Sequence, residues 1–334
     1  MQEEILSVFN IKKYFYETDF RQAFYLRRRS PHSVRAVDDI SFEVKRGKVF
    51  VLAGESGSGK TTVAKIILRA IDPDSGSIVF DGEDITRQTG KKLKEFRSFV
   101  QMVHQDPYTS LNPRMKIMDI IMEPLNIHDK RSSKEEKKEK VFSSLKDVRL
   151  EPAPEIAEKF PYTLSGGQRQ RVALARVLVI RPKLIIADEP VSMLDASVRA
   201  EILQLMKNLK DKFKISFLYI THDLSTSRYI GDDIAVMYAG KIVERGPIDR
   251  ILLNPLHPYT QALTDAIFQP NPGYSNNEKK IRIRQSDVSN PPNNHTGCRF
   301  YSRCPYYMNK CTNDPILTES NEKDHYVSCF LYPK

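Results

Sequence analysis

A glycine-rich segment offers the first candidate chemistry. Residues 54–61 have the sequence GESGSGKT, which fits the pattern G-x-x-x-x-G-K-[ST]. Glycines let consecutive backbone N–H groups surround phosphate oxygens, the lysine reaches the β and γ phosphates, and the threonine hydroxyl binds Mg²⁺. The apolar run 49–53 predicts a strand, and residues 61–70 predict a helix whose positive end faces the same anion. The segment therefore predicts a nucleoside triphosphate site, without specifying the reaction.

Two carboxylates follow a second apolar run. Residues 184–187 are Leu-Ile-Ile-Ala, and Asp188 and Glu189 come directly after them. A carboxylate at the carboxyl end of a buried parallel strand lies at the ligand edge of the sheet. We expect Asp188 to hold Mg²⁺ and Glu189 to polarise an attacking water. An ordinary acidic pair at a strand end is the alternative, which the accompanying phosphate loop disfavours.

A third motif, Leu-Ser-Gly-Gly-Gln at 164–168, precedes a helix expected over 168–179. Ser165 and the two glycines form a helix N-terminus that can bind an anion. Because the chain already has one phosphate loop, a second anion site indicates a nucleotide bound to another subunit.

The order of these motifs resembles the ATP-binding-cassette (ABC) ATPases. Gln105 matches the Q-loop, Asp195 the D-loop, His222 the switch histidine, and Phe15 the aromatic that stacks on adenine, with Tyr14 as the fallback. The resemblance implies that two cassettes sandwich two ATP molecules head to tail. It implies catalytic roles for Glu189, His222 and Gln105. It implies Mg²⁺ binding by Thr61, Gln105 and Asp188. It implies nucleotide binding by a larger set: Phe15, Gly54, Glu55, Ser56, Gly57, Ser58, Gly59, Lys60, Thr61, Thr62, Gln105, Asp188, Asp195 and, across the interface, Ser165, Gly166, Gly167 and Gln168.

Two further segments narrow the class. Residues 105–113 and 255–263 are similar to the oligopeptide/dipeptide importer ATPases, and a long loop at 17–33 is typical of the F-type cassette. The resemblance implies a second, paralogous cassette or a second copy as partner, two permease subunits, an indirect solute-binding protein, and a place on the cytoplasmic face of the membrane. An oligosaccharide importer is the alternative. A soluble cassette acting on ribosomes or DNA is a remote one, and the LSGGQ segment argues against a kinase.

The four cysteines suggest a second site. Cys298, Cys304, Cys311 and Cys329 lie close together near the end of the chain, and none precedes them. Clustered cysteines in a chain without secretion signals favour a metal over disulfides. Four thiolates suit a 4Fe–4S cluster, and the importer branch has a similar segment that binds one in some members. Zinc is the alternative, although the C-x₂-C spacing is missing. The third possibility is that the thiols are buried and bind no metal. We expect any metal to have a structural role.

Composition and pattern set the expected architecture. The chain has 334 residues, 40% of them hydrophobic, and a formal net charge of +10 that is scattered rather than concentrated, so we expect no nucleic-acid partner. No apolar run approaches a membrane span, and no signal segment is visible. Alternating strands and helices predict an α/β fold with a parallel sheet covered on both faces. The resemblance implies an ABC cassette with a RecA-like core, an antiparallel β subdomain and an inserted helical subdomain at about 112–165. We place the ATPase domain at 1–250 and a small metal-stapled extension at 251–334, with a linker over 269–294.

Overall fold

The computed structural model of the chain describes residues 3–16, 33–267 and 296–332. The chain forms two compact units. Unit 1 comprises Met1–Leu6, Val44–Val49 and Phe80–Ile220, and unit 2 comprises Ser7–Glu43, Phe50–Val79 and Thr221–Lys334. The expected linker and nearly all of the expected 17–33 loop lie outside the described residues. Ser33, which we expect in that loop, instead begins a strand. The domain boundary at 250/251 stays a prediction.

Three neighbouring parallel strands organise unit 1. They are β6 (Val100–Val103), β7 (Leu184–Asp188) and β8 (Ser216–Thr221), in the order β8-β7-β6. Every residue of β7 is buried, as expected for a strand covered on both faces. The register pairs Ala187 with Val103 and Asp188 with Ile220. The carboxyl ends of β6 and β7 therefore meet at one edge, where Gln105 and Glu189 follow.

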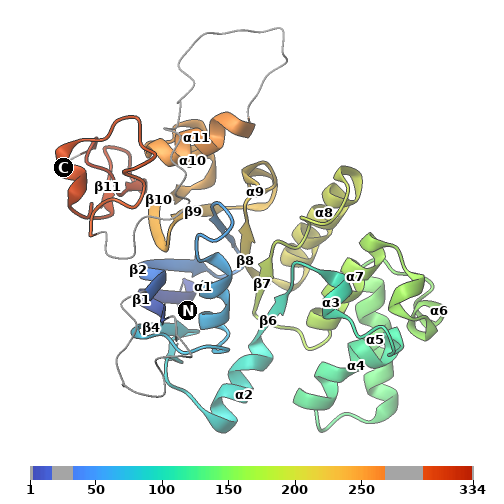
Figure 1. Ribbon diagram of the computed structural model, residues 1–334. Helices are drawn as coiled ribbons and strands as arrows, with labels where there is room; N and C mark the ends of the chain where they lie inside the picture. Colours follow the sequence, from blue (N-terminus) through green and yellow to red (C-terminus); the bar gives the residue numbers. More distant parts are fainter. Residues whose placement is uncertain (1–2, 17–32, 268–295, 333–334) are drawn as a thin grey trace, which may run out of the picture. The chain divides into compact units, whose positions relative to one another are not determined.

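Helices form most of the rest of unit 1. Helices occupy much of residues 112–165, and Figure 1 shows α4 to α7 gathered together; the bounds of the inserted subdomain stay a prediction. These helices pack on one another, and the Ser144 hydroxyl joins α5 to α7 by donating to the Ala175 carbonyl at 2.6 Å. No helix in the described ranges is long and apolar enough to cross a bilayer. The elements are β5 (Glu83–Asp84), α2 (Gly90–Phe99), α3 (Pro107–Ser110), α4 (Ile117–His128), α5 (Lys134–Asp147), α6 (Ala153–Glu158), a 3₁₀ turn (Pro161–Thr163), α7 (Gly166–Leu178) and α8 (Ala196–Phe213).

The main sheet of unit 2 is mixed rather than parallel throughout. Its strands, in the order β11-β12-β10-β9-β3, are β11 (Thr318–Glu319), β12 (Tyr326–Val327), β10 (Lys241–Pro247), β9 (Asp233–Tyr238) and β3 (Val49–Ala53). Among the described residues of this sheet, β3 and β9 pair in parallel and the other neighbours are antiparallel. The expectation of a parallel sheet is wrong here because Ala239 and Gly240 both have positive φ, 45° and 85°, which closes a tight hairpin between β9 and β10. The short strands β12 and β11 then continue the antiparallel pairing.

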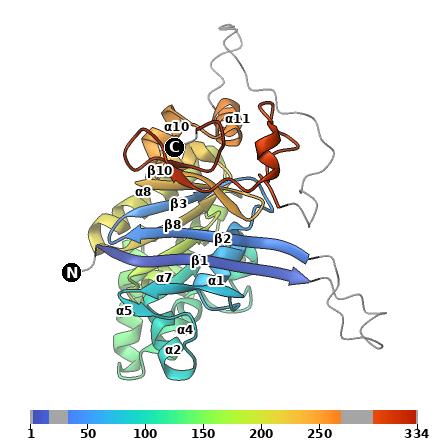
Figure 2. The ribbon, with the colours of Figure 1, turned by 90° about the vertical axis from the view of Figure 1, so that its left-hand side faces the viewer.

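A second sheet and four helices complete the described part of unit 2. In Figure 2 the long strands β1 (Glu4–Tyr16) and β2 (Ser33–Lys45) run side by side, and β4 (Ser75–Phe80) follows β1 in the sheet. Phe42 of β2 stacks on Phe50 of β3 with ring centroids 5.0 Å apart, which ties the two sheets together through their buried faces. The helices are α1 (Lys60–Ile67), α9 (Leu224–Ile230), α10 (Ile248–Leu253) and α11 (Pro258–Ile267), with a 3₁₀ turn at Asn309–Thr312.

Candidate active site

The phosphate loop connects β3 to α1, as the sequence predicts. Lys60 is buried, and its ammonium donates hydrogen bonds to the carbonyl oxygens of Gly54 and Glu55, both at 2.8 Å, and to the Ser58 hydroxyl at 3.2 Å. The ammonium thus contacts its own loop, and these three acceptors are neutral oxygens. Phosphate oxygens are stronger acceptors for an ammonium because they carry charge. Ser56, Gly57 and Thr61 of the same loop are exposed to solvent. The arrangement is that of a loop that can exchange internal hydrogen bonds for an anion.

Two glycines of the loop are required by close backbone approach. Gly54 has φ of 150° and Gly59 has φ of 103°, values that side-chain-bearing residues rarely adopt. A Cβ on Gly54 would collide with the carbonyl oxygen of Met237 in β9, and one on Gly59 with the carbonyl oxygen of Ala36 in β2. The loop is therefore fixed against the backbone of two strands, which leaves its N–H groups in a defined arrangement.

Phe15, rather than its neighbour Tyr14, has an available ring. The Tyr14 hydroxyl donates to Asp38 at 2.6 Å, and burial, together with this hydrogen bond and the Asp38 charge, raises the pKa of Tyr14 to about 12. Phe15 at the end of β1 is 44% exposed, with the Lys13 ammonium 5.8 Å from its ring centroid. An exposed aromatic face suits stacking on a nucleobase, so the geometry favours Phe15 for the adenine role.

In unit 1 the structure brings two of the predicted catalytic residues together. The Gln105 amide donates to the Glu189 carboxylate at 3.0 Å. Asp188 ends β7 and is 6% exposed, while the Glu189 N–H donates to the Ile220 carbonyl at 2.9 Å. Glu189 has φ of 48°, an uncommon conformation for a residue with a side chain. Local strain of this kind persists where the surroundings hold a side chain in a set direction. The edge of the β6–β7 pair therefore presents two carboxylates and an amide, a donor set suited to Mg²⁺ and water.

The LSGGQ segment forms the predicted helix N-terminus. Ser165 caps α7: its hydroxyl accepts the Gln168 N–H at 3.3 Å, and the Gln168 side chain accepts the Ser165 N–H at 3.0 Å. This reciprocal cap starts the helix at Gly166, two residues before the predicted start. Gly167 is buried, and a Cβ there would lie 2.5 Å from a methyl of Val198. Ser165 remains exposed beside the positive end of the helix.

The remaining predicted residues lie at element ends. Asp195 is exposed and caps α8 by accepting the Val198 N–H at 3.0 Å. His222 is exposed on the turn after β8, and Asp223 next to it caps α9 through the Ser225 N–H at 2.9 Å. His222 and Lys60 belong to unit 2, whereas Asp188, Glu189, Gln105, Ser165 and Asp195 belong to unit 1. Their functional roles stay predictions.

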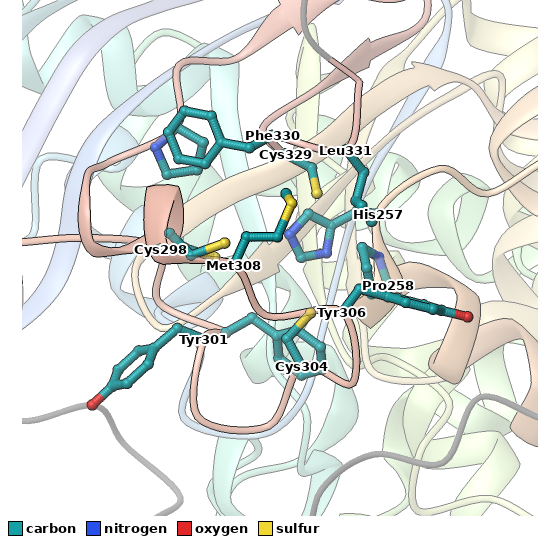
Figure 3. A pocket seen from close by; sticks show the side chains of 13 residues that line it. His257, Pro258, Cys298, Tyr301, Cys304, Tyr306, Met308, Cys329, Phe330 and Leu331 are labelled. Carbon is teal, nitrogen blue, oxygen red and sulfur yellow. The ribbon is translucent and has the colours of Figure 1, made fainter.

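The four cysteines share one cavity of unit 2. Cys298, Cys304, Cys311 and Cys329 are not joined by disulfides, and all line a largely apolar cavity with His257 (Figure 3). Burial raises the pKa of Cys298 to about 12 and that of Cys329 to about 11. However, no three or more His, Cys, Asp or Glu side chains of the described ranges are arranged to hold a metal ion. The thiols therefore converge without forming a ligand shell, and the predicted metal staple is not seen.

Two residues that contact the phosphate loop are not identified from the sequence. The Tyr259 hydroxyl accepts the Glu55 N–H, and the Arg303 guanidinium pairs with the Glu55 carboxylate. They lie 204 and 248 residues from Glu55 along the chain. Motif spacing carries no signal over such distances. Tyr259 does fall within the 255–263 segment that resembles the importer ATPases, but that resemblance gives it no role.

Comparisons with known proteins agree with this architecture. Residues 37–192 match the ABC transporter family, and residues 243–311 match the oligopeptide/dipeptide transporter C-terminal region. The oligopeptide transport ATP-binding protein AppF of Bacillus subtilis (strain 168) is 40% identical over 332 residues, 99% of this chain and 98% of that protein. The di/tripeptide transport ATP-binding protein DppF of Pseudomonas aeruginosa (strain UCBPP-PA14) is 42% identical over 89% of this chain and 92% of its own.

Solved structures match as well. The dimeric post-hydrolysis structure of the ATP-binding cassette MJ0796 with ADP and Pi has a TM-score of 0.63 and 26% identity, covering 73% of this chain and 98% of that one. The cbiO1 structure from Clostridium perfringens, part of the cbiONQ transporter complex, has a TM-score of 0.63 and 26% identity, covering 76% and 92%. With a relative matched along almost its whole length, the chain belongs to the ABC transporter ATP-binding proteins of the oligopeptide/dipeptide family.

Proposed function

We propose that this chain is the ATP-hydrolysing subunit that energises an importer of oligopeptides or dipeptides. The observation that carries the proposal is the likeness to peptide-transport ATP-binding proteins over 99% of the chain, which includes the segment after the cassette. The phosphate loop, the paired carboxylates and the capped LSGGQ helix supply the parts that ATP hydrolysis needs. An oligosaccharide importer is the second candidate, because the transported molecule does not contact this subunit.

Each predicted residue takes a role that suits its surroundings. Lys60 exchanges its loop carbonyls for phosphate oxygens, and Phe15 stacks on adenine. Thr61, Gln105 and Asp188 would be the residues that hold Mg²⁺, which would supply positive charge to offset that of the phosphoryl group. Glu189 accepts a proton from the attacking water, and Gln105, its hydrogen-bond partner, orients the carboxylate and the water. His222 senses the γ-phosphate. Asp195, at the start of α8, contributes to nucleotide binding.

The LSGGQ helix acts on a second nucleotide. We infer that Ser165, Gly167 and Gln168 bind the γ-phosphate held by another cassette, since the positive end of α7 and the exposed Ser165 hydroxyl form an anion site. The cassette MJ0796, which is similar in fold, forms a dimer with ADP and Pi. The partner is a paralogous cassette, or a second copy of this chain.

The subunit works at the cytoplasmic face of the membrane in this proposal. Its partners are two permease subunits, with a solute-binding protein outside the cell delivering the peptide. Tagged purification from detergent-solubilised native membranes tests this arrangement. Co-purification of permeases and a second cassette supports it. Ribosomal or DNA-associated partners without a permease would remove the transport assignment and leave the ATPase chemistry.

We also propose that the four cysteines bind a metal, with a 4Fe–4S cluster ahead of zinc. The support is that all four thiols line one cavity. Cysteine thiolates are ligands that both zinc and 4Fe–4S clusters take. Ligation would require these thiols to deprotonate and to form a common ligand shell, so metal binding would tighten the segment. Iron, sulfide and zinc analysis of anaerobically purified protein distinguishes the two metals. If the protein contains no iron, sulfide or zinc, the four cysteines are buried thiols that bind no metal.

The catalytic assignment is tested by Glu189→Gln. The substitution keeps the size of the side chain and its contact with Gln105 but removes the base. Turnover should fall by about 10²–10⁴-fold, while ATP binding persists. Glu201→Gln, which changes an exposed glutamate on α8 that pairs with Arg171 at 2.7 Å, is the matched control and should leave turnover unchanged. Equal turnover of Glu189→Gln and wild type would refute the role of Glu189.

A further inference from the structure

The short segment 298–304 carries two arginines that reach different parts of the nucleotide-binding half of unit 2. Arg303 pairs with Glu55 of the phosphate loop through two hydrogen bonds, at 2.8 and 3.0 Å. Arg299 pairs with Asp38 at 2.5 Å, and Asp38 also accepts the hydroxyl of Tyr14, the residue before Phe15. The segment 298–304 thus contacts the phosphate loop directly through Arg303. Through Arg299 and Asp38, it also reaches the strand that carries Phe15.

Glu55 is held at each of its polar groups. Its carboxylate pairs with Arg303, its N–H donates to the Tyr259 hydroxyl at 2.8 Å, and its carbonyl accepts from Lys60 at 2.8 Å and from the Ser58 N–H at 3.2 Å. Two of these partners, Tyr259 and Arg303, lie outside the phosphate loop, and their contacts with Glu55 do not involve the Lys60 ammonium. The position of the loop at Glu55 is therefore set from outside the loop.

A buried aromatic cluster fixes these two partners. Phe300 is 1% exposed, and its ring contacts those of Tyr259 and Tyr238 with centroids 5.5 and 5.2 Å apart. Tyr259 is also completely buried, and the Arg303 guanidinium is 3.3 Å from the Tyr238 hydroxyl. The cluster joins α11, β9 and the segment 298–304. Its packing restricts the Tyr259 hydroxyl and the Arg303 fork to few positions, which makes them effective supports for a loop.

We propose that Tyr259 and Arg303 are positioning residues for the phosphate loop, so that the C-terminal extension sets the affinity of the cassette for ATP. The inference rests on the proposed function, because it assigns these residues to the same nucleotide site. Neither Tyr259 nor Arg303 is proposed to touch the nucleotide. They act through Glu55, whose backbone precedes the N–H groups that surround phosphate.

Arg303→Gln and Tyr259→Phe in the full-length chain test the inference. Tyr259→Phe keeps the ring in the aromatic cluster and removes only the acceptor for the Glu55 N–H. Each variant should bind ATP about three- to tenfold more weakly by calorimetry, with KM raised and kcat changed little, since the supports act on binding geometry. Arg303→Lys keeps the charge without the two-pronged contact and should restore only part of the affinity.

Two comparisons separate positioning from general stability. Arg250→Gln removes another arginine that contacts the extension, near Glu322 at 4.0 Å, and should leave ATP affinity unchanged. In a Glu55→Gln background, Arg303→Gln should have almost no further effect on affinity, because its partner charge is gone. Unchanged ATP affinity in both Arg303→Gln and Tyr259→Phe, with a lowered melting temperature, would overturn the inference and leave a structural contact.

The proposed function is tested separately. If the wild-type chain binds and hydrolyses ATP and Lys60→Ala abolishes both, the ATPase assignment stands whatever the two support variants do. If wild-type protein fails to bind ATP, the proposed function fails first. An Arg303→Gln variant that does not fold leaves Tyr259→Phe as the deciding measurement.

Discussion

Replacing Arg299 with methionine removes one partner of a buried ion pair. The guanidinium lies 2.5 Å from Asp38 Oδ2, and the two side chains are only 6% and 9% exposed. After the change, the Asp38 carboxylate would keep the Tyr14 hydroxyl at 2.6 Å and the more distant Arg35 guanidinium at 3.8 Å. Its charge would then be buried with incomplete compensation, which is the costly outcome for an ion pair.

The magnitude follows from this geometry. Removing one partner of a buried pair costs about 3–5 kcal/mol of unfolding free energy. Because Tyr14 and Arg35 remain beside Asp38, we expect the lower end, about 3 kcal/mol. For a domain of 150–250 residues each kcal/mol lowers the melting midpoint by about 2–4 °C, so the midpoint should fall by about 6–12 °C. Asp38→Asn in the same chain should recover part of the loss, since no uncompensated charge then remains.

Thermal and urea unfolding of the two single variants and the double variant measure these quantities. Arg228→Met is the matched control, because its pairing with Asp249 at 3.4 Å is largely exposed and should leave the midpoint unchanged. The reasoning is wrong if Arg299→Met shifts the midpoint no more than Arg228→Met does. It is also wrong if the Arg299 and Asp38 effects simply add, since groups in contact should couple.

Two further changes test other parts of the structure. Gly167→Ala places a Cβ 2.5 Å from Val198 Cγ1, so urea unfolding should show that the free energy of unfolding falls by about 1–3 kcal/mol. Adding Val198→Ala to the same chain should restore this stability. A Gly167→Ala variant that is more stable than wild type would contradict the packing. His325 lies 2.7 Å from Glu244, and although burial lowers the pKa of His325, its hydrogen bonds and charge interactions with Glu244 and Glu322 raise it overall. Because the folded-state pKa is raised, its stabilisation is complete below the unfolded pKa and is lost as pH rises through the folded one. Wild type should therefore lose more unfolding free energy between about pH 6 and pH 9 than His325→Gln, and equal pH slopes would contradict the pair.

Local sequence patterns predict those parts of the site that a single strand and its adjoining loop form. The strand–loop–helix around Lys60 and the strand ending at Asp188 follow from hydrophobic runs and glycine spacing, and the structure confirms both. In both cases the signal lies within a few residues of the chemistry. The contact between Gln105 and Glu189 is not predicted from the sequence, and it forms because the neighbouring parallel strands β6 and β7 end at one edge.

The rest depends on contacts that no local pattern encodes. The supports of Glu55 come from the far end of the chain, and an arginine or tyrosine there is indistinguishable in sequence from a solvated one. The antiparallel turn after Tyr238 has the sequence Ala-Gly, and only the positive φ of Ala239 identifies it as a tight hairpin. Four cysteines predict a common location correctly, yet their spacing could not specify how far apart the sulfurs lie.

The pairing of β12 with β10 has a consequence for the solubility of the chain. Tyr326 and Val327 cover the outer side of β10 at Arg245 and Glu244, and the Ser328 N–H donates to the Val243 carbonyl at 2.8 Å. Without these last residues, β10 would present unsatisfied backbone groups that can pair with a strand of another molecule. The C-terminal residues thus guard against edge-to-edge self-association, and shortening the chain before Tyr326 removes that protection.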